Sequence, residues 1–298
     1  MSRQWRLELP LLIMLLPGTI LVLIYSYGPM LGIVIAFEKF IPSKGMFGSK
    51  WIGLDNFRQL LDIPNFFQVF WNTVFIAVMK IIAGLIVPMV FALLLNEVRH
   101  TLFKRGIQTL VYLPHFLSWV ILSGILIDIL SPNDGFVNNL LKTFGMEPVF
   151  FLGDPHWFPY TLIISDVWKE FGFGTIIYLA ALTGIDPTLY EAAVMDGAGR
   201  WRQTFHITLP GIRSVAVLLT VLSLGNVLNA GFDQVFNLYS PVVYETGDII
   251  DTLVYRTGLI DAQYGLATAV GLIKSVISFT LIVLSYRLAY RFANYRIF

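Results

Sequence analysis

Long apolar runs constrain this chain more than any other feature of its sequence. A helix that crosses a bilayer needs about 20 mostly apolar residues. Six such segments follow one another, at residues 9–37, 71–95, 107–130, 160–182, 214–238 and 264–290. The first is too long for a signal peptide, and no small-residue cleavage site follows it. The sequence therefore predicts an all-α integral membrane protein with six transmembrane helices.

Composition supports this prediction and narrows the possible functions. Charged residues make up 13% of the chain, whereas a soluble domain typically carries about 25%. The net charge of +1 gives no electrostatic attraction for nucleic acid. The chain has no cysteine, so disulfides and thiolate metal sites are excluded. Its four histidines are scattered and show no metal-ligand spacing. No catalytic nucleophile–base set is legible either, so we expect neither a metal site nor an enzyme.

Lysine and arginine in the loops predict the orientation of the spans, because cytoplasmic loops carry an excess of these residues. With the N-terminus inside, eleven of them face the cytoplasm: Arg3, Arg6, Arg99, Lys104, Arg105, Arg200, Arg202, Arg213, Arg287, Arg291 and Arg296. Six face outward: Lys39, Lys44, Lys50, Arg58, Lys142 and Arg256. We therefore expect both termini in the cytoplasm, together with the loop that joins the fourth and fifth spans.

That cytoplasmic loop carries the most specific motif in the chain. Its defining residues are Glu191, Ala192, Ala193, Asp196, Gly197, Ile207, Leu209 and Pro210. Asp186-Pro187 is a helix-start signal, because Asp caps free N–H groups and Pro suits the first helical position. A short helix is predicted over residues 188–196, ended by the glycines that follow. The paired alanines would let another surface approach the helix closely. The alternative is an ordinary amphipathic helix on the membrane surface.

The spacing of these residues resembles the EAA loop of permeases in ATP-binding-cassette (ABC) importers. Further segments are similar to the carbohydrate branch of that family: 51–57 (WIGLDNF), 72–73 (NT) and 94–97 (LLNE). Residues 112–116 (YLPHF) resemble a subset that imports complex saccharides. The similarity covers essentially the whole chain. The chain is thus identified by resemblance as a maltose-type, binding-protein-dependent permease.

This resemblance implies a function, a location and a set of partners. The chain would be a permease subunit of an ATP-driven importer that moves a saccharide, expected to be an oligosaccharide, across the bacterial cytoplasmic (inner) membrane. It would pair with a second homologous permease subunit and receive the sugar from an extracytoplasmic solute-binding protein. Two ATPase subunits would dock on the EAA loops, with Glu191 against a basic group of the ATPase. Membrane lipid would surround the helices.

The resemblance also implies a division of the chain and of the chemistry. Residues 1–70 would form a first helix and an outer loop, 71–290 the permease core, and 291–298 a cytoplasmic tail. ATP and magnesium would belong to the partner ATPase, because this chain has no G-x-x-x-x-G-K-[ST] phosphate loop. An ion-coupled secondary transporter remains the main alternative. Such a protein would use intramembrane charges for coupling and would have no need of an EAA loop.

Ionisable residues inside the predicted spans are candidates for a substrate pathway, because charge at membrane depth is costly and usually faces the bundle interior. Asp166, Lys169 and Glu170 share one face of the fourth span. They either line the pathway or form a self-neutralising cluster. Lys80 in the second span and Lys274 in the sixth either line a wet cavity, useful for an acidic saccharide, or pair with carboxylates on neighbouring spans.

The fifth predicted span offers a second set of pathway candidates. Asn226, Asn229, Asp233 and Phe236 recur at three- and four-residue steps, with Phe232 beside them. Sugar sites combine amides and carboxylates, which match hydroxyl groups, with flat apolar faces. The alternative is that the asparagines form hydrogen bonds between helices.

Overall fold

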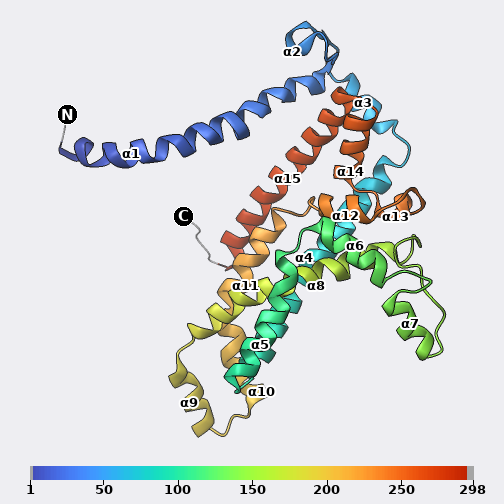
Figure 1. The fold of residues 1–298 in the computed structure, drawn as a ribbon. Helices are drawn as coiled ribbons and strands as arrows, with labels where there is room; N and C mark the ends of the chain where they lie inside the picture. The colour runs from blue at the N-terminus through green and yellow to red at the C-terminus, as the bar shows by residue number, and fades with distance from the viewer. Residues whose placement is uncertain (1–2, 294–298) are drawn as a thin grey trace. The chain divides into compact units, whose positions relative to one another are not determined.

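The computed structural model describes residues 3–293 (Figure 1). The chain forms two compact units, each described here by itself. The first contains the chain up to Phe66 together with Leu253–Ile273, and the second contains Phe67–Thr252 and the chain from Lys274 onward. Residues 294–298 of the predicted tail lie outside the described part.

In the first unit, one long helical segment leads into a small two-stranded hairpin. The segment consists of α1 (Arg3–Val22), a π-helical turn η1 (Leu23–Tyr27) and a 3₁₀ segment η2 (Gly28–Phe37). Pro17-Gly18 and Gly28-Pro29 each predict a bend in this segment, because sharp bends in helices occur at proline and glycine. The α-helix continues through Pro17, and its geometry changes instead just before Pro29. Proline has no N–H to donate, so a changed helix geometry before it is expected.

The hairpin pairs β1 (Glu38–Lys39) with β2 (Lys50–Trp51) in antiparallel register. Helix α2 (Gly45–Gly48) forms its tip, and α3 (Asp55–Leu61) follows. The buried Asn56 side chain donates to the carbonyl oxygens of Ala36 at 2.8 Å and Glu38 at 3.0 Å. Asn56 therefore fixes the hairpin to the end of η2. The π-helical turn η6 (Arg256–Ile260) and the first residues of α15 (Tyr264–Ala293) complete this unit.

The second unit contains the remaining membrane-length helices. In chain order its elements are α4 (Phe66–Asn96), α5 (Thr101–Tyr112), η3 (Leu113–Phe116), α6 (Trp119–Ile129), α7 (Phe136–Thr143), α8 (Phe158–Thr183), α9 (Pro187–Met195), α10 (Arg200–Gln203), η4 (Thr204–Thr208), α11 (Leu209–Leu224), α12 (Phe232–Leu238), η5 (Pro241–Val243), α13 (Tyr244–Gly247) and α14 (Ile250–Tyr255), with the rest of α15. Helix α5 packs against α8, and α12 packs against α6 and α8.

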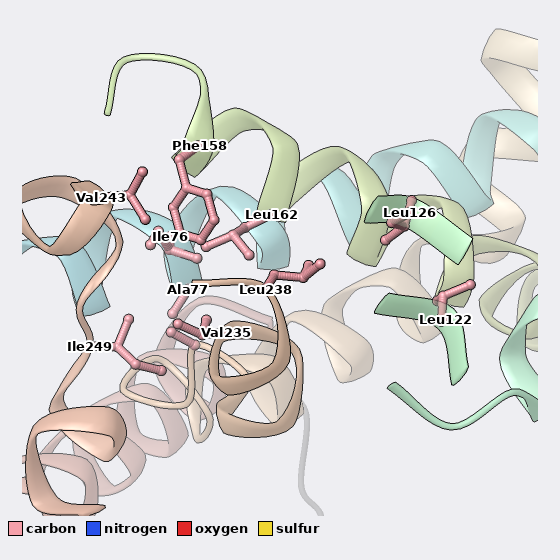
Figure 2. Close-up of a cluster of buried hydrophobic side chains, with 11 residues drawn as sticks. Ile76, Ala77, Leu122, Leu126, Phe158, Leu162, Val235, Leu238, Val243 and Ile249 are labelled. Carbon is pink, nitrogen blue, oxygen red and sulfur yellow. The ribbon is translucent and has the colours of Figure 1, made fainter. Parts of the chain in front are cut away.

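A buried apolar cluster joins the helices of this unit (Figure 2). Ile76 and Ala77 of α4 lie against Phe158 and Leu162 of α8 and Val235 of α12. Leu122 and Leu126 extend the cluster to α6. Lipid tails are as apolar as these side chains, so close packing between the side chains, and not their removal from water, holds these helices together.

Among the described residues, four helical segments are long and apolar enough to cross a membrane: Leu9–Phe37, Phe66–Asn96, Arg200–Leu224 and Tyr264–Arg287. Two further pairs of helices qualify if each bent pair is one span: Thr101–Phe116 with Trp119–Ile129, and Phe158–Thr183 with Pro187–Met195. The structure thus has four to six candidate spans. This range agrees with the prediction of a helical membrane protein, and the predicted number of six spans is its upper limit.

Two predicted spans differ from the observed helices. The third, at residues 107–130, is not straight: its two halves meet at 107° around Leu117-Ser118. The fifth, at 214–238, is shifted, because a continuous helix runs over Arg200–Leu224 and a break at residues 225–231 separates it from α12. Gly231 adopts a left-handed φ of 92° at that break. Apolar runs show where residues prefer lipid, but they do not show where a helix stops.

Candidate functional site

The EAA loop forms a short helix between two long ones, as the sequence predicted. Helix α9 follows α8 at an angle of 69°. The Asp186 side chain accepts a hydrogen bond from the Thr188 N–H at 2.9 Å, and Pro187 occupies the first turn. Accepting this bond lowers the pKa of the Asp186 carboxyl, because the bond favours the charged form. The predicted N-terminal cap is confirmed.

The end of α9 is a glycine turn. Gly197 has φ +73°, the left-handed region that favours glycine. The Gly197 N–H donates to the Val194 carbonyl at 3.0 Å, and the Ala198 N–H donates to the Ala193 carbonyl at 2.8 Å. This pair of bonds is the Schellman pattern of a helix end. The predicted role of Gly197 in ending the helix is confirmed.

The loop is anchored to the following helix while its motif residues face outward. The Tyr190 hydroxyl contacts Thr208 Oγ1 at 3.0 Å, and the Gln203 amide donates to the Ala198 carbonyl at 2.8 Å. Glu191, Ala192 and Asp196 are exposed, and Ala193 is half-buried. A solvent-facing acidic side chain beside small residues on an anchored helix suits docking of another protein.

The C-terminal residues of the motif lie where a π-helical turn meets a long helix. Ile207 lies in η4, and Leu209-Pro210 begins α11, both inside the continuous helical segment Arg200–Leu224. Proline is tolerated at a helix start, so Leu209-Pro210 suits this position, although the continuous segment begins nine residues earlier, at Arg200. Pro210 deprives the preceding turn of one N–H donor, and the wider turn of η4 accommodates this loss. Gly211 lies close to Ile185, since a Cβ at Gly211 would be 2.6 Å from Ile185 Cδ1.

Three lysines that lie inside predicted spans, Lys80, Lys169 and Lys274, each form an ion pair in the second unit. In the first group, Lys80 Nζ donates to the Ala230 carbonyl at 2.7 Å and to Gln234 Oε1, and lies 3.4 Å from Asp166 Oδ1. The Gln234 amide in turn donates to the Leu162 carbonyl at 2.8 Å. The exposed fraction of Lys80 is 8% and that of Gln234 is 0%. This group joins α4, α8 and α12.

The second group lies at the bend of the third predicted span. Lys169 Nζ donates to Glu170 Oε1 at 2.5 Å and to the His115 carbonyl at 3.2 Å, and it lies 5.6 Å from the centre of the Trp119 ring. His115 Nδ1 lies 2.6 Å from Glu170 Oε2. The His115 ring also stacks on Phe173 with ring centres 4.2 Å apart.

The third group pairs Lys274 of α15 with Asp251 of α14. Lys80, Lys169 and Lys274 thus each contact a carboxylate. For Lys80 this matches the pairing alternative, because Asp166 lies on another predicted span. Asp251, the partner of Lys274, instead lies between the fifth and sixth predicted spans. Lys169 and Glu170 pair with each other, as in the self-neutralising alternative, whereas Asp166 pairs with Lys80 of α4.

The polar stripe predicted on the fifth span is not formed as a single helical face. Asn226 and Asn229 lie in the break after α11, whereas Asp233 and Phe236 lie on α12. Glycine and asparagine at residues 225–231 favour turns, so the three- and four-residue spacing does not continue through them. Phe232 and Phe236 stack with ring centres 5.2 Å apart. Asn226, Asn229, Asp233 and Phe236 are all exposed in this chain.

Three residues that contact these charged groups were not identified from the sequence: Gln234, His115 and Asp251. Gln234 stands next to Asp233 in the polar stretch, but its spacing did not fit the stripe. His115 was set aside as a scattered histidine, although it lies in the segment 112–116. Asp251 lies between the fifth and sixth predicted spans. Their partners are distant in sequence, so only the fold brings the groups together.

These features define a class of protein: a helical membrane protein whose solvent-facing EAA helix joins two long helices. Residues 84–294 match the family of binding-protein-dependent transport system inner membrane components, and the chain belongs to that family. It is therefore a multi-pass permease subunit of an ABC transport system in the bacterial inner membrane.

Relatives of known name agree with this assignment. The polygalacturonan/rhamnogalacturonan transport system permease protein YteP of Bacillus subtilis is 45% identical over 95% of this chain and 88% of its own. Protein LplB of the same organism is 42% identical over 91% of this chain and 86% of its own. A crystal structure of a bacterial ABC transporter involved in import of the acidic polysaccharide alginate superposes with a TM-score of 0.89, at 39% identity over 97% of this chain and 98% of that chain.

Proposed function

We propose that this chain is one of two permease subunits of an ATP-driven importer that carries an acidic oligosaccharide into the cytoplasm. The observation that carries the proposal is helix α9, a capped and anchored helix that presents Glu191, Ala192 and Asp196 to solvent. Two ATPase subunits, which hold ATP and magnesium, dock on α9 and on its counterpart in the second permease. An extracytoplasmic binding protein delivers the sugar.

The proposal includes the topology. The chain crosses the membrane six times: the bent pair of Thr101–Phe116 and Trp119–Ile129 forms one span, α8 forms another, and both termini and α9 lie in the cytoplasm. The bias of lysine and arginine toward the predicted cytoplasmic loops supports this orientation. An outward-facing α9 could not meet an ATPase. Residues 71–290 form the transporting core in this proposal, and residues 1–70 add a first helix and an outer hairpin.

The choice of an acidic saccharide rests on relatives. One is named for polygalacturonan and rhamnogalacturonan, and a solved structure of a relative belongs to an alginate importer. These polymers carry uronic-acid carboxylates. A complex of that importer with a periplasmic protein holding an alginate pentasaccharide supports oligosaccharide delivery by a binding protein. Asn226, Asn229, Phe232, Asp233 and Phe236 are proposed to line the pathway, because amides and aromatic faces suit sugar.

The experiment is transport by the complete complex in proteoliposomes, with its own binding protein and ATP. We expect ATP-dependent uptake of oligogalacturonate, and little uptake of a neutral malto-oligosaccharide of the same length. Uptake driven by an imposed proton or sodium gradient without ATP would contradict the proposal and favour the ion-coupled alternative. Equal uptake of both sugars would overturn the acidic assignment alone.

A further inference from the structure

Two interrupted spans share an unusual feature: a lysine from another element satisfies a carbonyl group at each break. The last carbonyl groups of a helix, and those of the residues in a break, have no partner within a helix. In a membrane, water does not supply one, and an unsatisfied group costs several kcal/mol. The chemistry at these two breaks therefore decides whether broken helices can persist at membrane depth.

At the break between α11 and α12, the donor is Lys80 of α4. Its ammonium group lies 2.7 Å from the Ala230 carbonyl and 3.0 Å from the position of a Cβ on Gly231. Gly231 thus leaves the space that the ammonium group occupies. Gln234, one helical turn into α12, accepts from the same group. Lys80 therefore binds both the break and the helix that follows it.

At the break between η3 and α6, the donor is Lys169 of α8. Its ammonium group donates to the His115 carbonyl at 3.2 Å and faces the Trp119 ring at the start of α6. Ser118 caps α6 through its hydroxyl, which accepts from the Ile121 N–H. Lys169 therefore contacts both sides of this break.

Both lysines are neutralised by carboxylates of the same helix. Asp166 faces Lys80 at 3.4 Å and Glu170 contacts Lys169 at 2.5 Å. These carboxylates are four residues apart, so they lie on one face of α8. Residues 184–186 join α8 to α9 with a bend of 69°. Helix α8 thus contacts both broken spans and leads directly into the EAA helix.

We propose that Lys80 and Lys169 are positioning residues that tie the two broken spans to α8, so that movement of α9 is transmitted to both breaks. The proposal rests on the proposed function, because it needs α9 to be moved by an ATPase. It assigns these lysines to coupling and not to substrate contact. The ammonium groups of Lys80 and Lys169 donate to backbone carbonyls and carboxylates of this chain. These two lysines are therefore poorly placed to attract an acidic sugar.

The test measures saccharide moved per ATP hydrolysed by the reconstituted complex. Lys80→Met removes the donor at Ala230, and we expect the ratio to fall about tenfold while ATP hydrolysis persists, within the range of measured coupling energies. Asp166→Asn keeps the bonds of Lys80 to Ala230 and Gln234 but weakens its contact with α8, so the ratio should also fall, by less than in Lys80→Met. Lys142→Met is the matched control, since the exposed Lys142 also donates to a backbone carbonyl, that of Asn133 at 3.0 Å.

The double variant Lys80→Met/Asp166→Leu keeps the proposal testable if the single variant does not fold. Replacing a buried ion pair by apolar residues often leaves stability unchanged, but the Ala230 carbonyl still lacks its donor. We expect the double variant to form a folded complex that moves as little saccharide per ATP hydrolysed as Lys80→Met does. A wild-type ratio in this variant would overturn the proposal, as would a loss confined to acidic sugars. Failure of the wild type to import with ATP would instead contradict the proposed function.

Discussion

Gly197 sets the end of the EAA helix through its backbone alone. No atom lies within 4 Å of a Cβ built on it, yet its φ is +73°. An L-residue in this conformation costs about 1–2 kcal/mol. We expect Gly197→Val to fray the end of α9 and to reduce stimulation of ATP hydrolysis by the loaded binding protein. Gly197→Asn should retain most of it, because Asn tolerates this region.

Gly199 provides the control for Gly197. It also has open space around a Cβ, but its φ is −68°, which any residue adopts. Gly199→Val should therefore leave the stimulation close to that of the wild type. Equal losses at both positions would mean that side-chain bulk, and not backbone geometry, disturbs the loop.

Asp186 makes the start of α9 sensitive to acid. Its pKa is lowered from 3.8 by the hydrogen bond from Thr188. A lowered pKa means that the carboxylate stabilises the folded loop at pH values above 3.8 and that this contribution is lost as pH falls through the lowered value. We expect the protection of the Thr188 amide against hydrogen exchange to decrease over that range. In Asp186→Asn, whose amide oxygen does not titrate, protection should be independent of pH there.

Local chemistry at residue scale was largely predictable from sequence. Asp186, Pro187 and Gly197 form α9 as expected, because caps and turns depend on residues close in the chain. The pairings of Lys80 and Lys274 were only one of two alternatives. Gln234 and His115 were missed, because their partners Lys80 and Glu170 are more than 50 residues away.

At the scale of elements, the contact between α5 and α8 depends on one glycine. A Cβ on Gly172 would lie 2.1 Å from the Val111 carbonyl oxygen, and backbone cannot move aside easily. We expect Gly172→Ala to destabilise the protein by about 1–3 kcal/mol, as overpacking does. Thermal unfolding of the purified chain in detergent measures the effect.

Gly84 is the matched glycine, because it lies inside α4 with no atom within 4 Å of a Cβ. Gly84→Ala should be neutral or slightly stabilising, since alanine favours a helix by about 0.5–1 kcal/mol. If both substitutions lower the unfolding temperature equally, close approach of α5 and α8 is not the cause.

The positions of helix breaks were the main feature of the elements that hydropathy could not predict. The third predicted span bends by 107° and the fifth ends at Leu224. At both breaks a lysine of α4 or α8 donates to a backbone carbonyl, and a window of apolar residues carries no information about such donors. The predicted stripe from Asn226 to Phe236 is not one helical face, because the glycines and asparagines of residues 225–231 favour turns.

At the scale of the whole molecule, the apolar composition and the EAA spacing were sufficient to predict a membrane permease. The family match over residues 84–294 confirms this assignment. Orientation, six crossings and the partner subunits remain parts of the proposal. The cytoplasmic orientation and the ATPase partner can be tested at one surface, that of α9, because both require α9 to meet an ATPase in the cytoplasm.

Co-purification from the native membrane tests that requirement most directly. The wild-type chain should bring a second permease and an ATPase, identified by mass spectrometry. Glu191→Lys, which reverses an exposed charge on α9, should keep the second permease and lose most of the ATPase. Glu147→Lys, a charge reversal at an exposed residue outside α9, should keep both. If Glu191→Lys retains the ATPase in full, or if the wild type brings none, α9 is not the coupling surface.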